Sequence, residues 1–345
     1  MLQVITQLED GIRGLQFETQ KPNDSSPIRL CHTSCDLLDA GTLESYLATV
    51  KGWLDDNPYE VIAIMMGNNN GQDTKNPATD YVQPFQDSGI LEYVWTPSAR
   101  NLNLTQWPTM SEMILRNERV VVMIDYNADQ DAVPWLLSEF DYQWETPFSP
   151  TDPSFPCTQQ RPPNQAEDVS RNRMYMLNHN LNVEIAIAGV SILVPAYGLL
   201  DQVNAVSGNA SLGLNTQGCE EMWGRPPNWL LVDYYNFGNF NGSVFQVAAT
   251  ANGVSYNRKS CCGELRREKG VGYMHRVRWE TFSKDSHFMR LPREIRDPLV
   301  KDVPKVILSG VVKNDSKVKS EYPMSHPMHI RVFEFLAEQE AIFES

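Results

Sequence analysis

Polar side chains follow six short apolar runs of the sequence, and two of these side chains are histidines. The six residues are Glu18, His32, Asn68, Asp125, His179 and Asp233. A histidine can give or take a proton near neutral pH, and a carboxylate can orient a histidine or act as a ligand for a hard cation. The set therefore favours acid–base chemistry at one end of a group of strands.

The runs that precede these residues are typical of strands, and helical periods lie between them. Predicted strands cover residues 14–18, 28–32, 61–66, 120–125, 174–177 and 229–233. Predicted helices cover residues 42–55, 80–92, 110–116 and 132–140, and residues 189–203 could be strand, helix or both. Strands that are apolar throughout and separated by helices build a parallel sheet with both faces covered.

This alternation predicts an α/β fold, and we favour a (β/α)₈ barrel of the TIM type. The carboxyl ends of the strands in such a barrel form one mouth, where the six polar residues would meet. A doubly wound open sheet has similar strands. It normally carries a glycine-rich phosphate loop after an early strand, and the sequence contains neither G-x-G-x-x-G nor a Walker motif.

Charge and hydropathy exclude two classes of function. The formal net charge of −14 argues against nucleic acid as the main partner, because phosphate binding needs a basic surface. No apolar run reaches the roughly 20 residues of a membrane helix. The charge changes character near residue 263, since the last 82 residues carry 15 Lys and Arg against 13 Asp and Glu. We therefore predict a barrel over residues 1–263 and an unassigned, partly disordered tail over residues 264–345.

The cysteines and glycosylation motifs favour a secreted protein. An even number of cysteines without zinc or redox spacing favours three disulfides, in which Cys31 could pair with Cys35, Cys157 with Cys219, and Cys261 with Cys262. Asn-x-Ser/Thr acceptors occur at Asn23, Asn103, Asn209, Asn241 and Asn314. The first ten residues show no signal peptide, so we interpret the chain as missing its natural N-terminus. The alternative is a cytosolic protein with six reduced thiols.

Six motifs, in order along the chain, resemble the phosphatidylinositol-specific phospholipase C X-domain superfamily, and its fungal secreted branch in particular. They are QLEDGIR from Gln7, LCHTSCD from Leu30, DYNA from Asp125, NHNL from Asn178, MWGRPP from Met222 and LVDYY from Leu231. The resemblance covers residues 4–263. It implies a distorted, incompletely closed TIM barrel, a secreted or cell-surface location, and cleavage of a phosphodiester, with a phospholipid at a membrane surface as a candidate substrate.

By this resemblance His32 takes the place of the general acid that protonates the leaving alkoxide, and Asp233 that of a carboxylate supporting a catalytic histidine. The alternative roles are structural: His32 could hydrogen-bond backbone at a strand end, and Asp233 could cap a loop. The family's general base lies on a strand before the QLEDG helix. That helix begins here at about Val4, so we expect the chain as given to be short of one strand and of that histidine.

The phosphate and metal contacts are less defined. Relatives place an arginine or a Glu-x-Asp pair where this chain has Gln16-Phe17-Glu18. Glu18 and Asp125 could hold a divalent cation, Ca²⁺ or Mg²⁺, but are also ordinary strand-end residues. Arg225 is the candidate for the phosphate, with a structural salt bridge as its alternative. The other residues expected to line the substrate site are Trp223, Asn68, Asn127 and His179.

Two functions remain open from the sequence. The first is a phosphodiesterase that acts on a phospholipid or glycerophospho-type head group by histidine acid–base catalysis. The second is a catalytically incomplete barrel that binds a lipid or glycan, or serves as a structural secreted glycoprotein.

Overall fold

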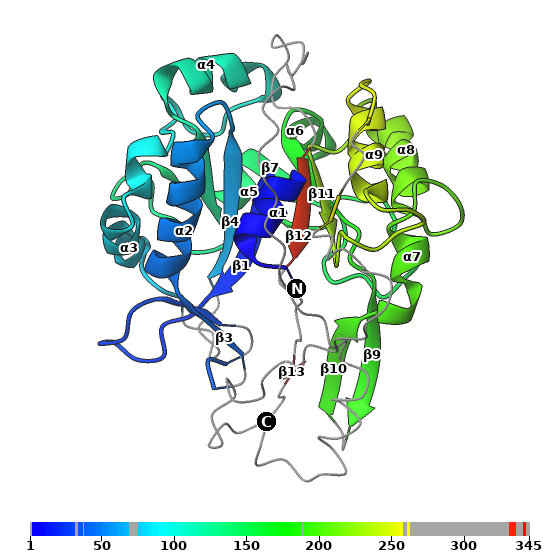
Figure 1. Cartoon of the computed structure of the whole chain (residues 1–345), viewed down its shortest axis with the longest axis horizontal. Helices are drawn as coiled ribbons and strands as arrows, with labels where there is room; N and C mark the ends of the chain where they lie inside the picture. Colours follow the sequence, from blue (N-terminus) through cyan, green and yellow to red (C-terminus); the bar gives the residue numbers. More distant parts are fainter. Residues whose placement is uncertain are drawn as a thin grey trace, which may run out of the picture.

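The centre of the fold is an eight-stranded sheet in which every neighbouring pair of strands is parallel (Figure 1). The computed structural model describes residues 2–31, 34–36, 38–68, 75–187, 190–257, 261–262, 331–335 and 341–342. The strand order is β6-β5-β4-β1-β12-β11-β8-β7. The strands are β1 (Gly14–Thr19), β4 (Ile62–Asn68), β5 (Val120–Ile124), β6 (Leu136–Ser138), β7 (Gln143–Glu145), β8 (Met174–Asn178), β11 (Trp229–Val232) and β12 (Arg331–Phe335).

The two edge strands of this sheet are consecutive in the chain. Only the four-residue helix α5 (Glu139–Tyr142) separates β6 from β7, so the sheet has to curl until its two edges approach each other. Within the described residues no hydrogen-bonded ladder joins β6 to β7. The α/β class and the parallel sheet are therefore confirmed, whereas a closed TIM barrel is not.

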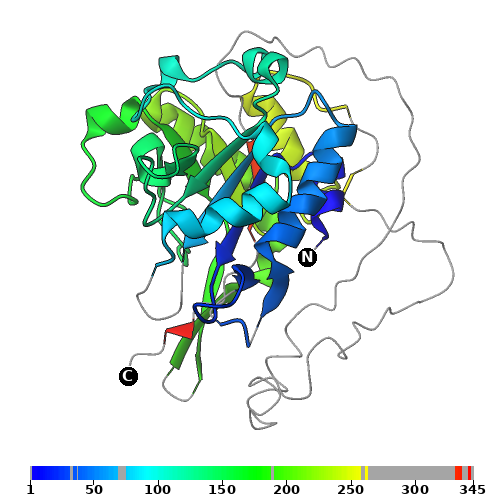
Figure 2. The same ribbon diagram turned by 90° about the vertical axis from the view of Figure 1, so that its left-hand side faces the viewer.

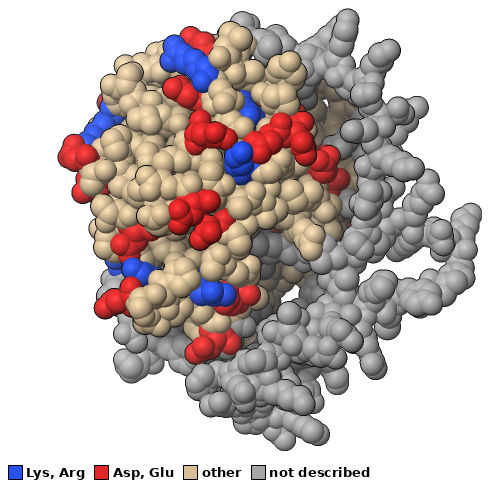
Figure 3. All heavy atoms as spheres, turned by 60° about the vertical axis from the view of Figure 1, so that its left-hand side comes forward, with Lys and Arg blue, Asp and Glu red and all other residues tan. Residues whose placement is uncertain are grey.

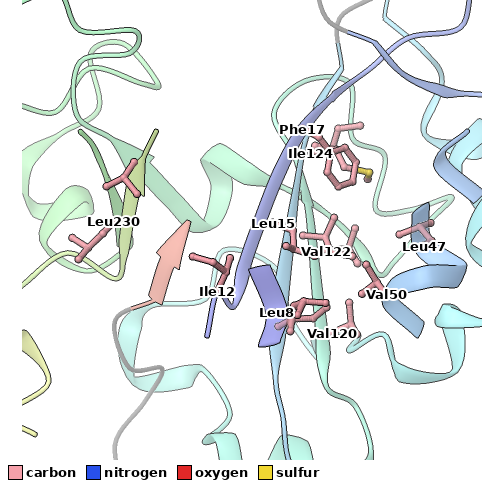
Figure 4. Packing of buried hydrophobic residues seen from close by; sticks show 14 of the residues in the cluster. Leu8, Ile12, Leu15, Phe17, Leu47, Val50, Val120, Val122, Ile124 and Leu230 are labelled. Atoms are coloured by element: carbon pink, nitrogen blue, oxygen red, sulfur yellow. The ribbon is translucent and has the colours of Figure 1, made fainter. Parts of the chain in front are cut away.

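A continuous apolar core holds the helices against the sheet. Strands β4 and β5 are buried along their whole lengths, which explains why both read as uninterrupted apolar runs. Helix α2 (Leu43–Asp56) begins at Thr42, whose side chain accepts a hydrogen bond from the Ser45 N–H. Figure 4 shows Leu47 and Val50 of α2 beside Val122 of β5 in this core.

The other helices lie along the outside of the sheet (Figures 1 and 2). They are α1 (Val4–Asp10), α3 (Val82–Asp87), α4 (Met110–Arg116), α6 (Glu167–Arg171), α7 (Leu200–Val203), α8 (Leu212–Trp223) and α9 (Ser243–Ala251). The predicted helix 110–116 is confirmed residue for residue. The predicted helix 80–92 is divided into η1 (Ala78–Tyr81), α3 and η2 (Ile90–Tyr93), because Gly89 adopts a left-handed φ of 76°.

One helix prediction, for residues 132–140, is wrong. Residues 132–140 contain strand β6, and helix begins only at Glu139. The pairing of Leu136 with Val122 on the buried β5 outweighs the helical period, and Pro134 interrupts that period. In the C-terminal segment, for which no element was predicted, the structure describes β12 and strand β13 (Ala341–Ile342).

Two smaller sheets lie at the end of the molecule to which the β1 arrow points in Figure 1. One pairs β2 (Arg29–Cys31) with β3 (Asp39–Thr42), and the other contains β9 (Asn182–Ile187), β10 (Val190–Pro195) and β13. The open prediction for 189–203 resolves into β10, the turn η4 (Tyr197–Leu199) and α7, so both types of structure occur there.

The cysteine prediction is confirmed, because the disulfides are Cys31–Cys35, Cys157–Cys219 and Cys261–Cys262. Basic and acidic side chains are interspersed on the face shown in Figure 3, with no broad basic patch among its described residues. None of the helices in the described ranges is long and apolar enough to cross a bilayer.

Candidate functional site

The carboxyl ends of β4 and β5 are fastened together by Asn68 and Asp125. The N–H of Asn68 donates to Oδ1 of Asp125 at 2.8 Å, and the N–H of Tyr126 donates to the same oxygen at 2.7 Å. The Asn68 amide also donates to the carbonyls of Asn76 and Tyr126, at 2.9 and 3.1 Å. Asn68 is fully buried, and all of these hydrogen bonds are to other protein groups. Its side chain therefore holds the loops of the mouth in place and is not available to bind a substrate.

Asn127 lies at the same end of the sheet. Its side-chain amide donates to the carbonyl of Asn76 at 2.9 Å, so Asn68 and Asn127 hold the same loop residue. Asn127 adopts a left-handed φ of 61°, which asparagine tolerates better than most residues. The structure therefore brings Asn68, Asn127 and Asp125 together, as the sequence predicted.

An acidic cluster extends this site along the ends of β5, β6, β7 and β8. The cluster consists of Asp125, Glu139 and Glu145 around Arg161. Arg161 Nη1 lies 3.2 Å from Glu145 Oε2, and Arg161 Nη2 lies 3.5 Å from Asp125 Oδ2. Glu139 and Glu145 are 2% and 1% exposed and share a hydrogen bond.

Burial changes the protonation of this cluster. Removal from water, followed by the neighbouring Glu145 carboxylate, raises the pKa of Glu139 well above its ordinary value. Burial also raises the pKa of Asp125, against the opposing effects of the Asn68 N–H and of Arg161. These effects favour the neutral form of Glu139, and Arg161 lies between the carboxylates of Glu145 and Asp125 as their cation.

Aromatic rings surround the guanidinium of Arg161. Its carbon lies 4.3 Å from the ring centroid of Phe148, 5.0 Å from that of Phe140 and 5.6 Å from that of Tyr126. The sequence reasoning did not identify Glu139, Glu145 or Arg161. Glu139 follows the three-residue strand β6, Glu145 ends the three-residue strand β7, and Arg161 lies in a proline-rich loop. Hydrophobic periodicity gives little signal in such segments, and only the Gln143-Trp144-Glu145 strand could have pointed to these residues.

Asp233 follows β11 and is the most isolated carboxyl of the mouth. It is 3% exposed, and burial raises its pKa to about 7. Its Oδ1 has no hydrogen-bond partner among the described residues. An acid in this setting exchanges its proton near neutral pH, which is the property that acid–base chemistry requires.

His179 is a core residue in this structure. Its ring nitrogens lie 3.0 Å from Asn215 Oδ1 and 3.0 Å from the Val203 carbonyl, and its ring stacks on Phe155 at 3.8 Å. Burial lowers its pKa to about 4, so it stays neutral above acidic pH. With both nitrogens engaged and no exposed surface, the geometry gives it no contact with a substrate.

Arg225 and Trp223 lie at the other end of the strands. Arg225 donates to the carbonyl of Arg173 and to Asn228 Oδ1 at 2.9 Å, and both acceptors flank the amino end of β8 or β11. Trp223 donates to the Cys157 carbonyl at 2.8 Å. The structure therefore does not bring either side chain to the mouth, and it corrects the expectation that Arg225 binds the phosphate there.

The predicted cation ligands, Glu18 and Asp125, are separated by β4. The Glu18 carboxylate lies against Gly67, where a Cβ would come within 2.3 Å of Oε1. Asp125 already accepts two N–H bonds and faces Arg161. In the described ranges no group of three His, Cys, Asp or Glu side chains is arranged to hold a metal, so this donor set does not fit a cation and we derive no step through one.

His32 lies outside the described residues. Its neighbour Cys31 ends β2 and is bonded to Cys35, and Gln20, just past β1, forms a bridge with Arg29 of β2. The chain on both sides of His32 is thus held at the carboxyl end of β1. A surface pocket lined by Leu102, Asp168 and Arg173 contains none of the predicted site residues.

Comparison with known proteins identifies the family of the chain. The family model PI-PLC X, the X domain of phosphatidylinositol-specific phospholipase C, matches residues 1–249. An "Uncharacterized secreted protein" of Arthroderma benhamiae is 56% identical over 76% of this chain and 58% of its own length. A "PI-PLC X domain-containing protein 1" of the same fungus is 38% identical over 73% of this chain and 78% of its own length.

A PI-PLC X domain-containing protein of Arabidopsis thaliana is 23% identical over 72% of this chain and 54% of its own length. The chain thus spans little more than half of two of these three relatives. No solved structure matches.

Proposed function

Because the chain belongs to the phosphatidylinositol-specific phospholipase C X-domain family, we propose that it hydrolyses a phosphodiester of a phospholipid or glycerophospho-type head group at the carboxyl end of its parallel sheet. The proposal takes the sheet as an open barrel, whose curl gathers residues from distant strands. In this reaction an oxygen nucleophile loses its proton, attacks phosphorus and displaces an alkoxide, which takes up a proton.

The buried carboxyl of Asp233 is the observation that carries the proposal. Its raised pKa of about 7 and its Oδ1 without a partner among the described residues are costly for folding, so they favour a functional role. The family resemblance assigns Asp233 to the support of a catalytic histidine. A carboxylate in that role accepts a ring N–H and stabilises the charged imidazole.

His32 is the proposed general acid. An imidazole with an ordinary pKa holds a proton in a useful fraction of molecules near neutral pH and can pass it to the leaving oxygen. The disulfide Cys31–Cys35 supports this role, because it ties down the backbone on both sides of the histidine. Cys31, the residue before His32, ends β2, and Gln20, just past β1, forms a bridge with Arg29 of β2.

The acidic character of the mouth favours a second function, binding without hydrolysis. A phosphoryl group needs positive charge around it, yet Arg161 is already engaged by Asp125 and Glu145. A site of this charge fits an uncharged glycan or a zwitterionic head group better than a dianionic one. The second candidate is therefore a lipid- or glycan-binding protein of the secreted type that the fungal relative's name describes.

A hydrolysis assay separates the two functions. We would incubate the full chain with glycerophosphocholine, phosphatidylcholine and phosphatidylinositol, with and without Ca²⁺, and measure released phosphate esters. We expect hydrolysis that His32→Ala and Asp233→Asn reduce at least 100-fold. The exposed Asp56→Asn at the end of α2 is the matched control and should keep full activity. Absence of turnover on all three substrates, in a folded protein, would support the binding function instead.

A further inference from the structure

The sequence Asn103-Leu104-Thr105 is one of the five Asn-x-Ser/Thr acceptors and leads into the turn η3 (Leu104–Gln106). Oδ1 of Asn103 accepts the N–H of Thr105 at 3.0 Å and the Thr105 hydroxyl at 2.7 Å. The N–H of Asn103 donates to Gln106 Oε1 at 2.9 Å, so both the backbone and the side-chain oxygen of this asparagine are held in place. Asn103 is exposed, and its Nδ2 makes no hydrogen bond within the described residues. Nδ2, the atom to which a sugar attaches, is thus the unengaged end of a fixed side chain.

Asn103 also lines a surface hollow of about 360 Å³. This volume falls within the range of roughly 300–1,000 Å³ that small-molecule sites in proteins occupy. Leu102, which is 4% exposed, and the half-buried Val169 supply apolar surface to the hollow. The other residues that line it carry amide, carboxylate and guanidinium groups, and they are Asn101, Asp168, Asn172 and Arg173.

Backbone and side-chain contacts hold together the segments around this hollow. The N–H of Leu104 donates to the carbonyl of Asn172 at 2.9 Å, and the Arg173 guanidinium donates to the carbonyl of Phe140 at 2.7 Å. Asn172 and Arg173 directly precede β8, so the hollow lies at the amino end of the sheet, away from the mouth. In Figure 1 this end carries α6, whose residues 168 and 169 line the hollow. A group seated there would leave the mouth open.

We propose that Asn103 is N-glycosylated and that the hollow seats the first sugar of the glycan. In this reaction Nδ2 attacks the anomeric carbon of an oligosaccharide linked to a polyprenyl diphosphate. A bond forms between nitrogen and that carbon, the bond from the carbon to the diphosphate oxygen breaks, the diphosphate leaves with the bonding electrons, and the amide gives up one proton to the transferring enzyme. The reaction belongs to secretion, which the three disulfides and the name of a fungal relative favour.

The groups around the hollow match the surface of a sugar. A pyranose ring presents C–H groups on its faces and hydroxyl groups at its rim. Leu102 and Val169 offer apolar contact to the C–H groups, and the side chains of Asn101, Asp168 and Asn172 offer hydrogen-bond partners to the hydroxyls. Because the covalent bond to Asn103 gives the sugar a high effective concentration at the hollow, modest contacts are enough to seat it.

The remaining acceptors lack this combination of features. Asn23 resembles Asn103 locally, since its Oδ1 accepts the Ser25 hydroxyl at 2.8 Å. Neither Asn23 nor Asn209 nor Asn241 lines the hollow, and Asn314 lies outside the described residues. The proposal therefore concerns Asn103.

The first experiment locates the glycan. We would secrete the full chain from eukaryotic cells behind an added signal peptide and release its N-glycans with an amidase, which converts each carrier asparagine to aspartate. Peptide mass spectrometry should find this change at position 103 in most molecules. Thr105→Ala should lose the glycan, whereas Thr105→Ser, which keeps a hydroxyl, should retain it. An unmodified Asn103 in the secreted wild type would overturn the proposal, and so would a glycan that persists on Asn103 in Thr105→Ala.

The second experiment measures the seat. An endoglycosidase trims each glycan to its first sugar, and cells in which synthesis of the lipid-linked oligosaccharide is inhibited yield the same chain without sugar. We expect the trimmed wild type to unfold at a midpoint about 2 °C or more above that of the sugar-free chain. Val169→Ala should reduce this difference by at least half. Val82→Ala is the matched control, because Val82 on α3 is likewise half-buried and does not line the hollow, and it should keep the difference.

Each variant is compared with its own sugar-free form, so the effect of the substitution itself and of sugars at other acceptors cancels. Equal differences in wild type and Val169→Ala would overturn the seating of the sugar in the hollow. Neither experiment involves turnover of a substrate, so the outcome is independent of the proposed function.

Discussion

The hydroxyl of Tyr235 donates a 2.5 Å hydrogen bond to Oδ2 of Asp10, across 225 residues of sequence. The other oxygen of Asp10 accepts the N–H of Cys262 at 3.0 Å. One buried carboxylate thereby connects the first helix, the loop after β11 and the vicinal disulfide. Helix α1 leads into β1 and Tyr235 follows β11, and these two strands flank β12 in the sheet, so the contact links the two sides of β12.

Loss of this contact should lower stability without touching the mouth. We expect Tyr235→Phe to reduce the free energy of unfolding by about 1–3 kcal/mol, because it leaves a buried carboxylate oxygen short of a donor. Chemical denaturation measures the change. Tyr59→Phe, at a tyrosine that is 78% exposed, should leave the unfolding free energy within about 0.5 kcal/mol of wild type. Equal losses in both variants would contradict the role of the Asp10 contact.

The sequence predicted the parts of the fold that long apolar runs or clear helical periods determine. Strands β4 and β5 were evident because residues 62–66 and 120–124 are apolar throughout, and α2 and α4 because of their helical periods. The three-residue strands β6 and β7 were missed, since their identity comes from pairing with β5 and β8. Glu139, Glu145 and Arg161 were not predicted for the same reason, because the segments that carry them are too short to show a periodic pattern.

The positions of three residues were predicted because a strand end alone decides where they lie. Asn68, Asp125 and Asp233 lie at the mouth because the strands before them are parallel. His179 also follows a strand, yet its side chain turns toward Asn215 and the core. The prediction for Arg225 was wrong because it followed the family motif, although the motif precedes the predicted strand 229–233 and so lies at the amino end of β11.

Asp233 should make the protein less stable as pH rises. Its pKa is raised from 3.8 to about 7 in the folded state, so the folded protein binds the proton more tightly than the unfolded chain. The difference in unfolding free energy between wild type and Asp233→Asn should therefore move against wild type from about pH 4 to pH 7. The full change is roughly 4 kcal/mol, from 1.36 kcal/mol for each pKa unit. A pH-independent difference would show that a partner compensates the buried charge.

His179 should produce the opposite slope. Burial lowers its pKa from 6.5 to about 4, so the unfolded chain binds the proton more tightly between these values. Its contribution to stability is complete above pH 6.5 and is lost as the pH falls toward 4. We expect His179→Gln to lose stability at pH 7 but to show a flatter profile between pH 6.5 and 4, measured by urea unfolding. Hydrolysis of a soluble substrate should persist in this variant, in contrast to Asp233→Asn.

The acidic cluster offers a comparison between Glu139 and Arg161. Because burial and the neighbouring Glu145 carboxylate raise the pKa of Glu139 and favour its neutral form, Glu139→Gln should change stability at pH 7 by less than about 1 kcal/mol. Arg161→Met leaves Glu145 and Asp125 without their cation and should lower the unfolding free energy by about 3–5 kcal/mol. Thermal unfolding at pH 7 distinguishes the two. If Glu139→Gln proved as damaging as Arg161→Met, the assigned protonation would be wrong.

Strand β12 makes a prediction about the C-terminal segment. It pairs with β1 on one side, where Gly14 lies opposite Phe333, and with β11 on the other, where Val232 lies opposite Glu334. Its removal would leave the facing edges of β1 and β11 with unpaired backbone N–H and C=O groups. Paired strands lie about 4.8 Å apart, so β1 and β11, which are two such spacings apart, could pair with each other only by moving closer. A chain ending at residue 330 should therefore unfold at a midpoint at least about 5 °C lower than a control ending at residue 342. A synthetic peptide of residues 329–337 should restore part of this loss by refilling the same position in trans. Equal midpoints for both truncations would mean that β1 and β11 do not depend on β12 for their pairing.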